Sequence, residues 1–163
     1  MDQKTLAPIS KHSNRSFIFL AILAVIIGGS LYIFFRTSDH LFFRWFSFLG
    51  LDNWFEALRN HSLSTSSHLP DWVVYSLPNS LWAFAYALLI TSLWYGNKSW
   101  LKYIWMASIP VLVIGFEVLQ YTGTIHGTFC IQDLTLGIVG LTLGCIVGIK
   151  LKNQNNHEKA SEY

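Results

Sequence analysis

The sequence predicts an all-α membrane protein, organised as a bundle of four transmembrane helices. Of its 163 residues, 52% are hydrophobic and 12% are charged, and a soluble domain of this size carries about twice that share of charge. Four apolar stretches are also long enough for a helix to cross the hydrocarbon core of a bilayer. We therefore expect lipid, rather than a water-excluding core, to surround most side chains.

The expected spans are residues 17–35, 72–95, 101–121 and 133–149, which form a single transmembrane domain over residues 17–149. The first span is the clearest, because it has no charge and its 19 residues cover roughly 28 Å at about 1.5 Å per residue. Residues 1–16 then form a cytoplasmic N-terminal segment. Residues 150–163 form a polar cytoplasmic tail that we expect to lack regular structure.

The first apolar stretch could instead belong to a cleaved signal peptide, because basic residues precede it. The apolar core of a signal peptide is about 7–15 residues long and ends at a small-residue cleavage pattern. This stretch is longer and is followed by Phe34, Phe35 and Arg36. We therefore expect it to remain as an anchor.

Lys and Arg residues are distributed unevenly about the four spans, and basic residues in short loops are retained in the cytoplasm. With the N-terminus inside, the cytoplasmic basic residues are Lys4, Lys11, Arg15, Lys98, Lys102, Lys150, Lys152 and Lys159, and the outer ones are Arg36, Arg44 and Arg59. Both termini are therefore expected in the cytoplasm of a multi-pass cell-membrane protein. The net charge of +2 is too small to argue for a nucleic-acid partner.

The outer segment, residues 36–71, is rich in aromatic residues. Its apolar residues recur at near-helical spacing, at Trp45, Leu49, Trp54, Phe55 and Leu58. This pattern predicts one or two helices lying in the membrane interface. The segment is interpreted either as a cover over the bundle or as a lid that approaches a lipid-linked substrate. His40, His61 and His68 lack the spacing of a zinc site, so no metal or cofactor is expected.

Two carboxylates lie inside or at the rim of the last two spans. A carboxylate at membrane depth costs at least a few kcal/mol unless it is paired or hydrated, so it commonly marks a functional site. Glu117 and Gln120 are three residues apart and share a helix face. Glu117 is a candidate acid, base or headgroup ligand, and Gln120 is a candidate for orienting it. Asp133 could position a cationic or hydroxyl group, or it could only cap the last helix.

Other polar and small residues complete the set of candidates. Asn79 and Tyr86 are seven residues apart on one helix face and could line a polar interior. His126 is either a cationic partner of Glu117 or a solvated loop residue. The last span carries small residues at four-residue spacing, which predicts close helix packing; they are Gly137, Gly140, Gly144 and Gly148.

The arrangement of these motifs resembles that of the VanZ-like membrane proteins. The resemblance covers residues 115–148 and consists of Glu117-x-x-Gln120, then Gly127-Thr-Phe129, then Asp133-Leu followed by Gly140-x-x-x-Gly144. The family pattern also includes an Arg before the Asp and an Asn four residues after it, where this chain has His126 and Gly137. The resemblance implies a small bacterial membrane protein associated with low-level resistance to teicoplanin-type glycopeptides.

Three functions are compatible with these residues. The protein could act on, or alter the exposure of, an envelope lipid or lipid-linked glycan at the outer leaflet. It could instead be a small proton-coupled transporter, or a structural scaffold that associates with itself or with a membrane partner protein. No catalytic motif decides whether it is an enzyme.

Overall fold

The computed structural model describes residues 13–35, 48, 50, 69–125 and 128–161. In this part of the chain, all regular structure is helical: α1 (Ser13–Phe35), α4 (Asp71–Tyr75), α5 (Leu77–Trp94), α6 (Leu101–Tyr121) and α7 (Ile131–Ser161). The predicted all-α class is confirmed. The aromatic outer segment, with His40, His61 and His68, lies outside the described residues except for Phe48, Gly50 and its last three positions.

Three of the described helices are long and apolar enough to cross a membrane. The spanning stretches are Ser16–Phe35 in α1, Leu101–Tyr121 in α6 and Ile131–Gln154 in α7. α5, with 18 residues, is not among these stretches. The chain is therefore a membrane-embedded helical protein.

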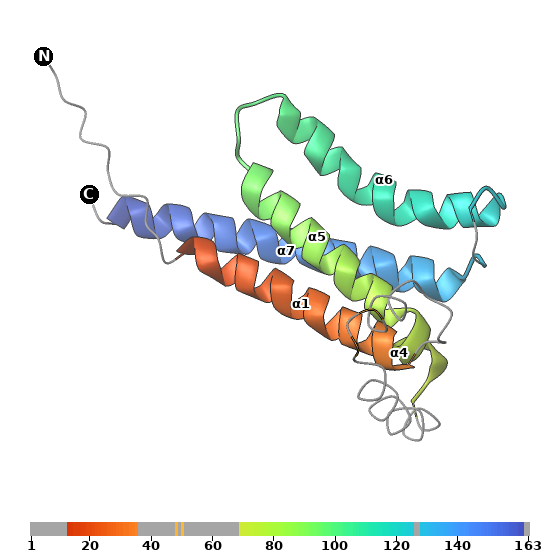
Figure 1. Ribbon diagram of the computed structural model, residues 1–163. Helices are drawn as coiled ribbons and strands as arrows, with labels where there is room; N and C mark the ends of the chain where they lie inside the picture. The colour runs from red at the N-terminus through yellow and green to blue at the C-terminus, as the bar shows by residue number, and fades with distance from the viewer. Residues whose placement is uncertain (1–12, 36–47, 49, 51–68, 126–127, 162–163) are drawn as a thin grey trace, which may run out of the picture.

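The long helices alternate in direction along the chain and form a bundle whose centre is the α5–α7 pair (Figure 1). α1 and α6 lie on opposite sides of this pair. Two hydrogen bonds show that α5 and α7 run in the same direction. Ser80 donates to the Leu136 carbonyl near the start of both helices, and Thr91 donates to the Cys145 sulfur further along both. Trp94 stacks on Trp105 across the α5–α6 turn, so α6 runs back along α5.

The glycines of α7 allow its close approach to α5. A Cβ atom on Gly140 would overlap the Ser80 carbonyl oxygen, and one on Gly144 would overlap the Phe84 carbonyl oxygen. A Cβ atom on Gly148 would lie 2.9 Å from the Thr91 Cβ. The α7 glycine face, Gly140, Gly144 and Gly148, is thus occupied by α5 of the same chain, which is how small residues permit backbone contact between membrane helices.

The structure differs from the prediction of one helix over residues 72–95. This region is divided into α4 and α5, which meet at Ser76. Pro78 has no backbone N–H, so it cannot donate to the carbonyl of Val74, and its ring disfavours a straight helix there. Ser76 and Ser80 still donate to the carbonyls four residues before them. The chain therefore forms the short helix α4 and the longer helix α5 in place of one continuous helix.

The prediction of a tail without regular structure after residue 149 is wrong. α7 continues without a break to Ser161. Residues 150–161 contain neither proline nor glycine, and extending an existing helix avoids the cost of nucleating a new one. A polar composition alone therefore did not end the helix.

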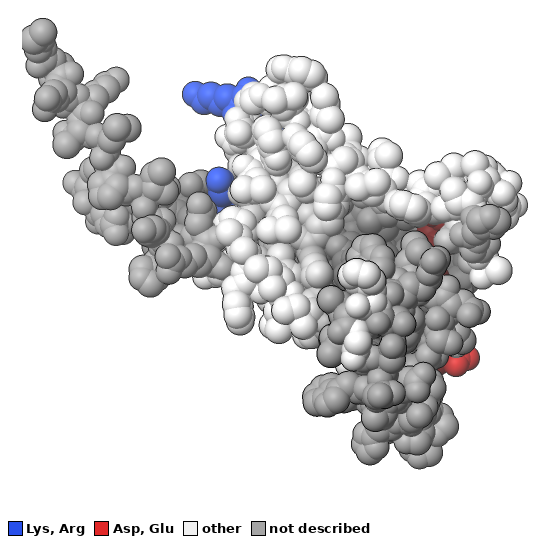
Figure 2. Space-filling view, viewed as in Figure 1, with Lys and Arg blue, Asp and Glu red and all other residues white. Residues whose placement is uncertain are grey.

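The two ends of the bundle differ in charge. Among the side chains that the structure describes, the basic ones are Lys98, Lys102, Lys150 and Lys152, and the acidic ones are Asp71, Glu117 and Asp133. Figure 2 shows the basic groups toward the end that carries the α5–α6 turn and the acidic groups toward the opposite end. The charge is therefore segregated along the bundle axis.

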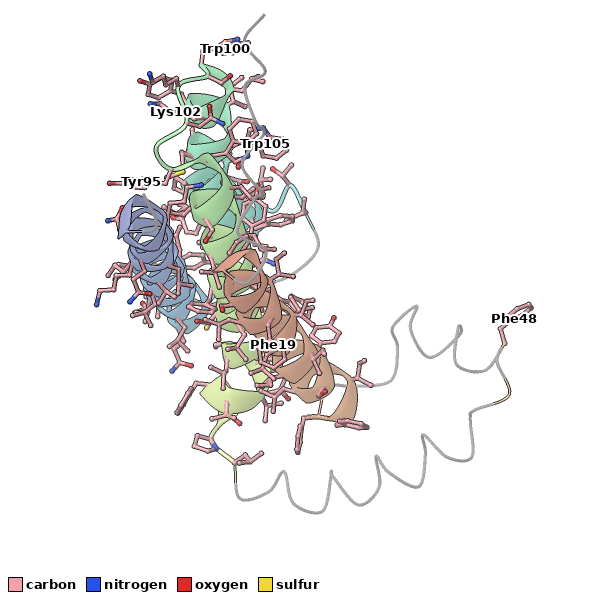
Figure 3. The ribbon with its side chains drawn as sticks, turned by 90° about the vertical axis from the view of Figure 1, so that its left-hand side faces the viewer. Phe19, Phe48, Tyr95, Trp100, Lys102 and Trp105 are labelled. Carbon is pink, nitrogen blue, oxygen red and sulfur yellow. The ribbon has the colours of Figure 1, made fainter. Side chains whose placement is uncertain are left out.

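Exposed aromatic side chains surround the basic end (Figure 3). Tyr95, Trp100, Tyr103 and Trp105 are all exposed there, and the Lys102 ammonium lies 4.9 Å from the centre of the Tyr103 ring. Tyr and Trp favour the level of the lipid headgroups, where their rings and polar edges are both accommodated. This cluster thus has the composition of a membrane-interface belt.

One interhelical hydrogen bond supports a test of the α5–α7 contact. The Ser80 hydroxyl donates to the Leu136 carbonyl at 2.7 Å. We expect Ser80→Ala to lower the free energy of unfolding by about 0.5–1.5 kcal/mol, measured by thermal unfolding in detergent. Thr142→Ala is the control, because the Thr142 hydroxyl is exposed and bonds only within α7. Equal losses in both variants would contradict a specific α5–α7 hydrogen bond.

Candidate functional site

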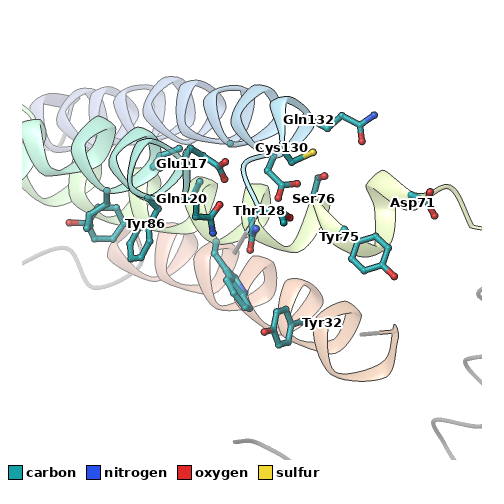
Figure 4. Close-up of a pocket in the computed structure, with 18 residues that line it drawn as sticks. Tyr32, Asp71, Tyr75, Ser76, Tyr86, Glu117, Gln120, Thr128, Cys130 and Gln132 are labelled. Carbon is teal, nitrogen blue, oxygen red and sulfur yellow. The ribbon is translucent and has the colours of Figure 1, made fainter. Parts of the chain in front are cut away.

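A cavity of about 880 Å³ lies at the acidic end of the bundle (Figure 4). It is lined by residues of α1, α4, α5, the C-terminal half of α6, the loop that precedes α7 and the start of α7. Its described lining residues are Tyr32, Asp71, Tyr75, Ser76, Asn79, Trp82, Ala83, Tyr86, Leu112, Val113, Phe116, Glu117, Gln120, Thr128, Cys130, Gln132, Asp133 and Gly137. Its volume is within the range typical of small-molecule sites.

The cavity brings together most of the residues singled out from the sequence. Its lining includes Glu117, Gln120, Asp133, Asn79, Tyr86 and Gly137. The α7 glycine face does not line it and instead contacts α5. His126 lies outside the described residues. Polar groups far apart in the sequence thus share one concave site.

Glu117 is the most deeply buried acidic group at this site. Its exposed fraction is 8%, although it lies only one turn before the end of α6. The backbone N–H of Cys130 donates to its carboxylate, whereas its Oε2 atom has no hydrogen-bond partner among the described residues. The Glu117 Oε2 atom can therefore accept a hydrogen bond from a group that enters the cavity.

Asp133 faces Glu117 from the neighbouring helix. The two carboxylates are close enough to interact electrostatically, and the Asp133 Oδ1 atom is buried without a hydrogen-bond partner in the described structure. α7 begins at Ile131, so Asp133 lies inside its first turn and not at its N-cap, contrary to the capping alternative. Its position still favours the positive end of the helix dipole.

The remaining wall of the cavity is mixed in character. The Tyr86 hydroxyl lies 2.7 Å from the Ser108 hydroxyl, a hydrogen bond that ties α5 to α6. On the opposite side, the Tyr32 and Trp82 rings are 5.5 Å apart between centroids. Aromatic surface therefore lines the same cavity as the two carboxylates.

Several lining residues were not singled out from the sequence. Asp71 comes from the short helix α4 and Ser76 from its junction with α5, a break that the continuous apolar pattern of residues 72–95 concealed. Tyr32 and Trp82 also line the cavity, but in the sequence nothing distinguishes them from the other residues of the predicted membrane spans. The Pro78-Asn79-Ser80 sequence was the available signal, because proline and polar residues inside a span often accompany irregular backbone beside a cavity.

The described lining contains no Lys, Arg or His. Nor do the described residues include a group of three or more His, Cys, Asp or Glu side chains that could hold a metal ion. The site thus presents three carboxylates, three amides, hydroxyl groups and aromatic rings. It is suited to bind a polar group that donates hydrogen bonds, attached to an apolar remainder.

No protein-family model, curated protein or solved structure matches this chain.

Proposed function

We propose that the protein is a VanZ-like membrane protein of the bacterial cell membrane, which acts on or alters the exposure of an envelope lipid or lipid-linked glycan at the outer leaflet. The observation that carries the proposal is the cavity in which Glu117 and Asp133 each retain a buried oxygen without a hydrogen-bond partner among the described residues. Buried polar groups are normally paired, and an exception requires a reason. A bound headgroup would supply the missing partners.

In this proposal the chain crosses the membrane four times, with α4 and α5 together forming the second crossing. The alternating directions of α1, α5, α6 and α7 support four crossings, as does the length over which α5 lies against the α7 glycine face. Both termini are then cytoplasmic. The gathering of the described lysines at one end of the bundle supports this orientation.

The cavity would then lie near the outer surface of the membrane. Lipid headgroups and the sugars of lipid-linked glycans are found at that level, and their acyl or prenyl chains remain in the apolar core. The exposed side chains of Leu112 and Phe116, at 43% and 56%, lie beside the cavity. An amphiphilic ligand matches this combination of polar centre and apolar rim.

A scaffold is the competing function, because interhelical hydrogen bonds alone can retain polar residues in a membrane protein. In a scaffold, Glu117 and Asp133 would bond to neighbouring helices. Their unpartnered oxygens favour a ligand site instead. The α7 glycine face is also occupied by α5, so it is not free to contact a second protein.

The test is teicoplanin susceptibility of a sensitive bacterium that expresses the wild-type protein, Glu117→Gln or Asp133→Asn at matched membrane abundance. We expect the wild type to raise the inhibitory concentration severalfold and each substitution to remove that gain. Glu158→Gln, near the C-terminal end of α7, is the matched control and should retain it. Equal susceptibility of all strains would reject this envelope function.

A further inference from the structure

We infer that the group recognised in the cavity is a primary ammonium group carried by an envelope lipid. This inference rests on the proposed function, and it names the substrate class of the same site. Glu117 carries the argument, because its side chain is more than nine-tenths buried and its Oε2 atom, on the cavity wall, lacks a hydrogen-bond partner among the described residues.

The charge of the site favours a cation. Two carboxylates interact across the cavity, and no basic side chain occurs in its described lining. Buried charges in proteins are paired or bind metal ions, and the described residues offer no cluster of metal-ligating side chains. An organic cation would therefore offset the repulsion between Glu117 and Asp133.

The hydrogen bonding favours a primary ammonium over other cations. An R–NH₃⁺ group has three N–H donors, as the Lys side chain does, and can donate to the Glu117 Oε2 and Asp133 Oδ1 atoms at once. A quaternary ammonium has no N–H donor and would leave both oxygens without a partner. A hydroxyl group has one donor and no charge, so it would satisfy one oxygen only.

The aromatic rings of the wall support the same ligand. Tyr32, Trp82 and Phe116 line the same cavity as the carboxylates, and aromatic faces attract cations. These rings also provide apolar contact for the part of a lipid next to its headgroup. A phosphoethanolamine headgroup has the required chemistry.

The experiment measures lipid binding to the purified full-length protein in detergent by native mass spectrometry. The probes are dioleoyl phosphatidylethanolamine, phosphatidylcholine and phosphatidylglycerol, which share acyl chains and differ in headgroup. We expect a roughly tenfold preference for the ethanolamine lipid over the other two, equivalent to about 1.4 kcal/mol. Glu117→Gln and Asp133→Asn should each reduce the preference to within about twofold, and Glu158→Gln should keep it.

A competition experiment distinguishes a lipid ligand from a soluble amine ligand. Free ethanolamine that displaces the lipid at equal concentration would overturn the lipid source. N-acetylethanolamine, which lacks the cation, should not displace the lipid at any concentration, and displacement by it would overturn the ammonium assignment.

The lipid selectivity is measured on the wild-type protein, so misfolding of a variant cannot affect that measurement. Equal binding of the three lipids would overturn the inference. If protection against teicoplanin still required Glu117, the proposed function would survive that result. Selective ethanolamine-lipid binding by a protein without any effect on susceptibility would instead support the ammonium site and reject the proposed function.

Discussion

Replacing Gly140 by alanine is expected to destabilise the bundle by about 1–3 kcal/mol, the usual cost of overpacking a well-packed interface. The added Cβ atom would overlap the Ser80 carbonyl oxygen and lie 2.7 Å from the Ser80 Oγ atom. The carbonyl belongs to the backbone of α5, so it cannot move aside as a flexible side chain could. α5 and α7 would have to separate. Thermal unfolding in detergent micelles measures the effect.

Gly115→Ala on α6 is the matched control. No atom lies within 4 Å of the position that its Cβ would occupy. Alanine has a higher helix propensity than glycine by about 1 kcal/mol, so this substitution should leave stability unchanged or raise it. A loss of the same size in both variants would show that glycine matters here for a reason other than close α5–α7 contact.

Glu117→Gln is expected to raise the free energy of unfolding, on the order of 1–3 kcal/mol, the desolvation cost of leaving a buried polar group unpaired. The substitution removes a carboxylate that lies beside Asp133. It also introduces an amide N–H group that can donate to the Asp133 carboxylate, whose Oδ1 atom has no partner among the described residues. The thermal midpoint of the ligand-free protein in detergent is the measurement.

Tyr86→Phe is the contrasting variant. It removes the 2.7 Å hydrogen bond to Ser108 and should lower stability by about 0.5–1.5 kcal/mol. The two lining residues are thus expected to shift the midpoint in opposite directions. A decrease for Glu117→Gln would mean that the carboxylate holds the helices together, which favours the scaffold over the ligand site.

Hydrophobic length predicts the membrane helices well, because each helix satisfies its own backbone hydrogen bonds in lipid. The regions around α1, α6 and α7 were all recognisable as apolar stretches. The sequence predicted helix boundaries wrongly at two places, where the apolar pattern does not follow the course of the backbone. The break at Ser76 follows from the missing N–H of Pro78, and the extension of α7 to Ser161 follows from an existing helix that nothing terminates.

The candidate site was predictable in part. Glu117 and Gln120 are three residues apart on a helix, so their shared face could be inferred without coordinates, and both line the cavity. The contributions of Asp71 and Tyr32 could not be inferred, because neither the register of α1 against α5 nor the placement of α4 is encoded in hydropathy. In lipid, every apolar face is equally well solvated, so apolar pattern alone does not select which faces meet.

The sequence by itself determined the membrane class of this protein, its helical content and the presence of carboxylates at one end, since these depend on composition and local spacing. Only the tertiary structure decided that α5 fills the α7 glycine face and that Glu117 and Asp133 share one cavity. The physical reason is that helix association in a membrane depends on close packing and on pairing between residues of different helices. Those interactions arise only when the helices are placed together.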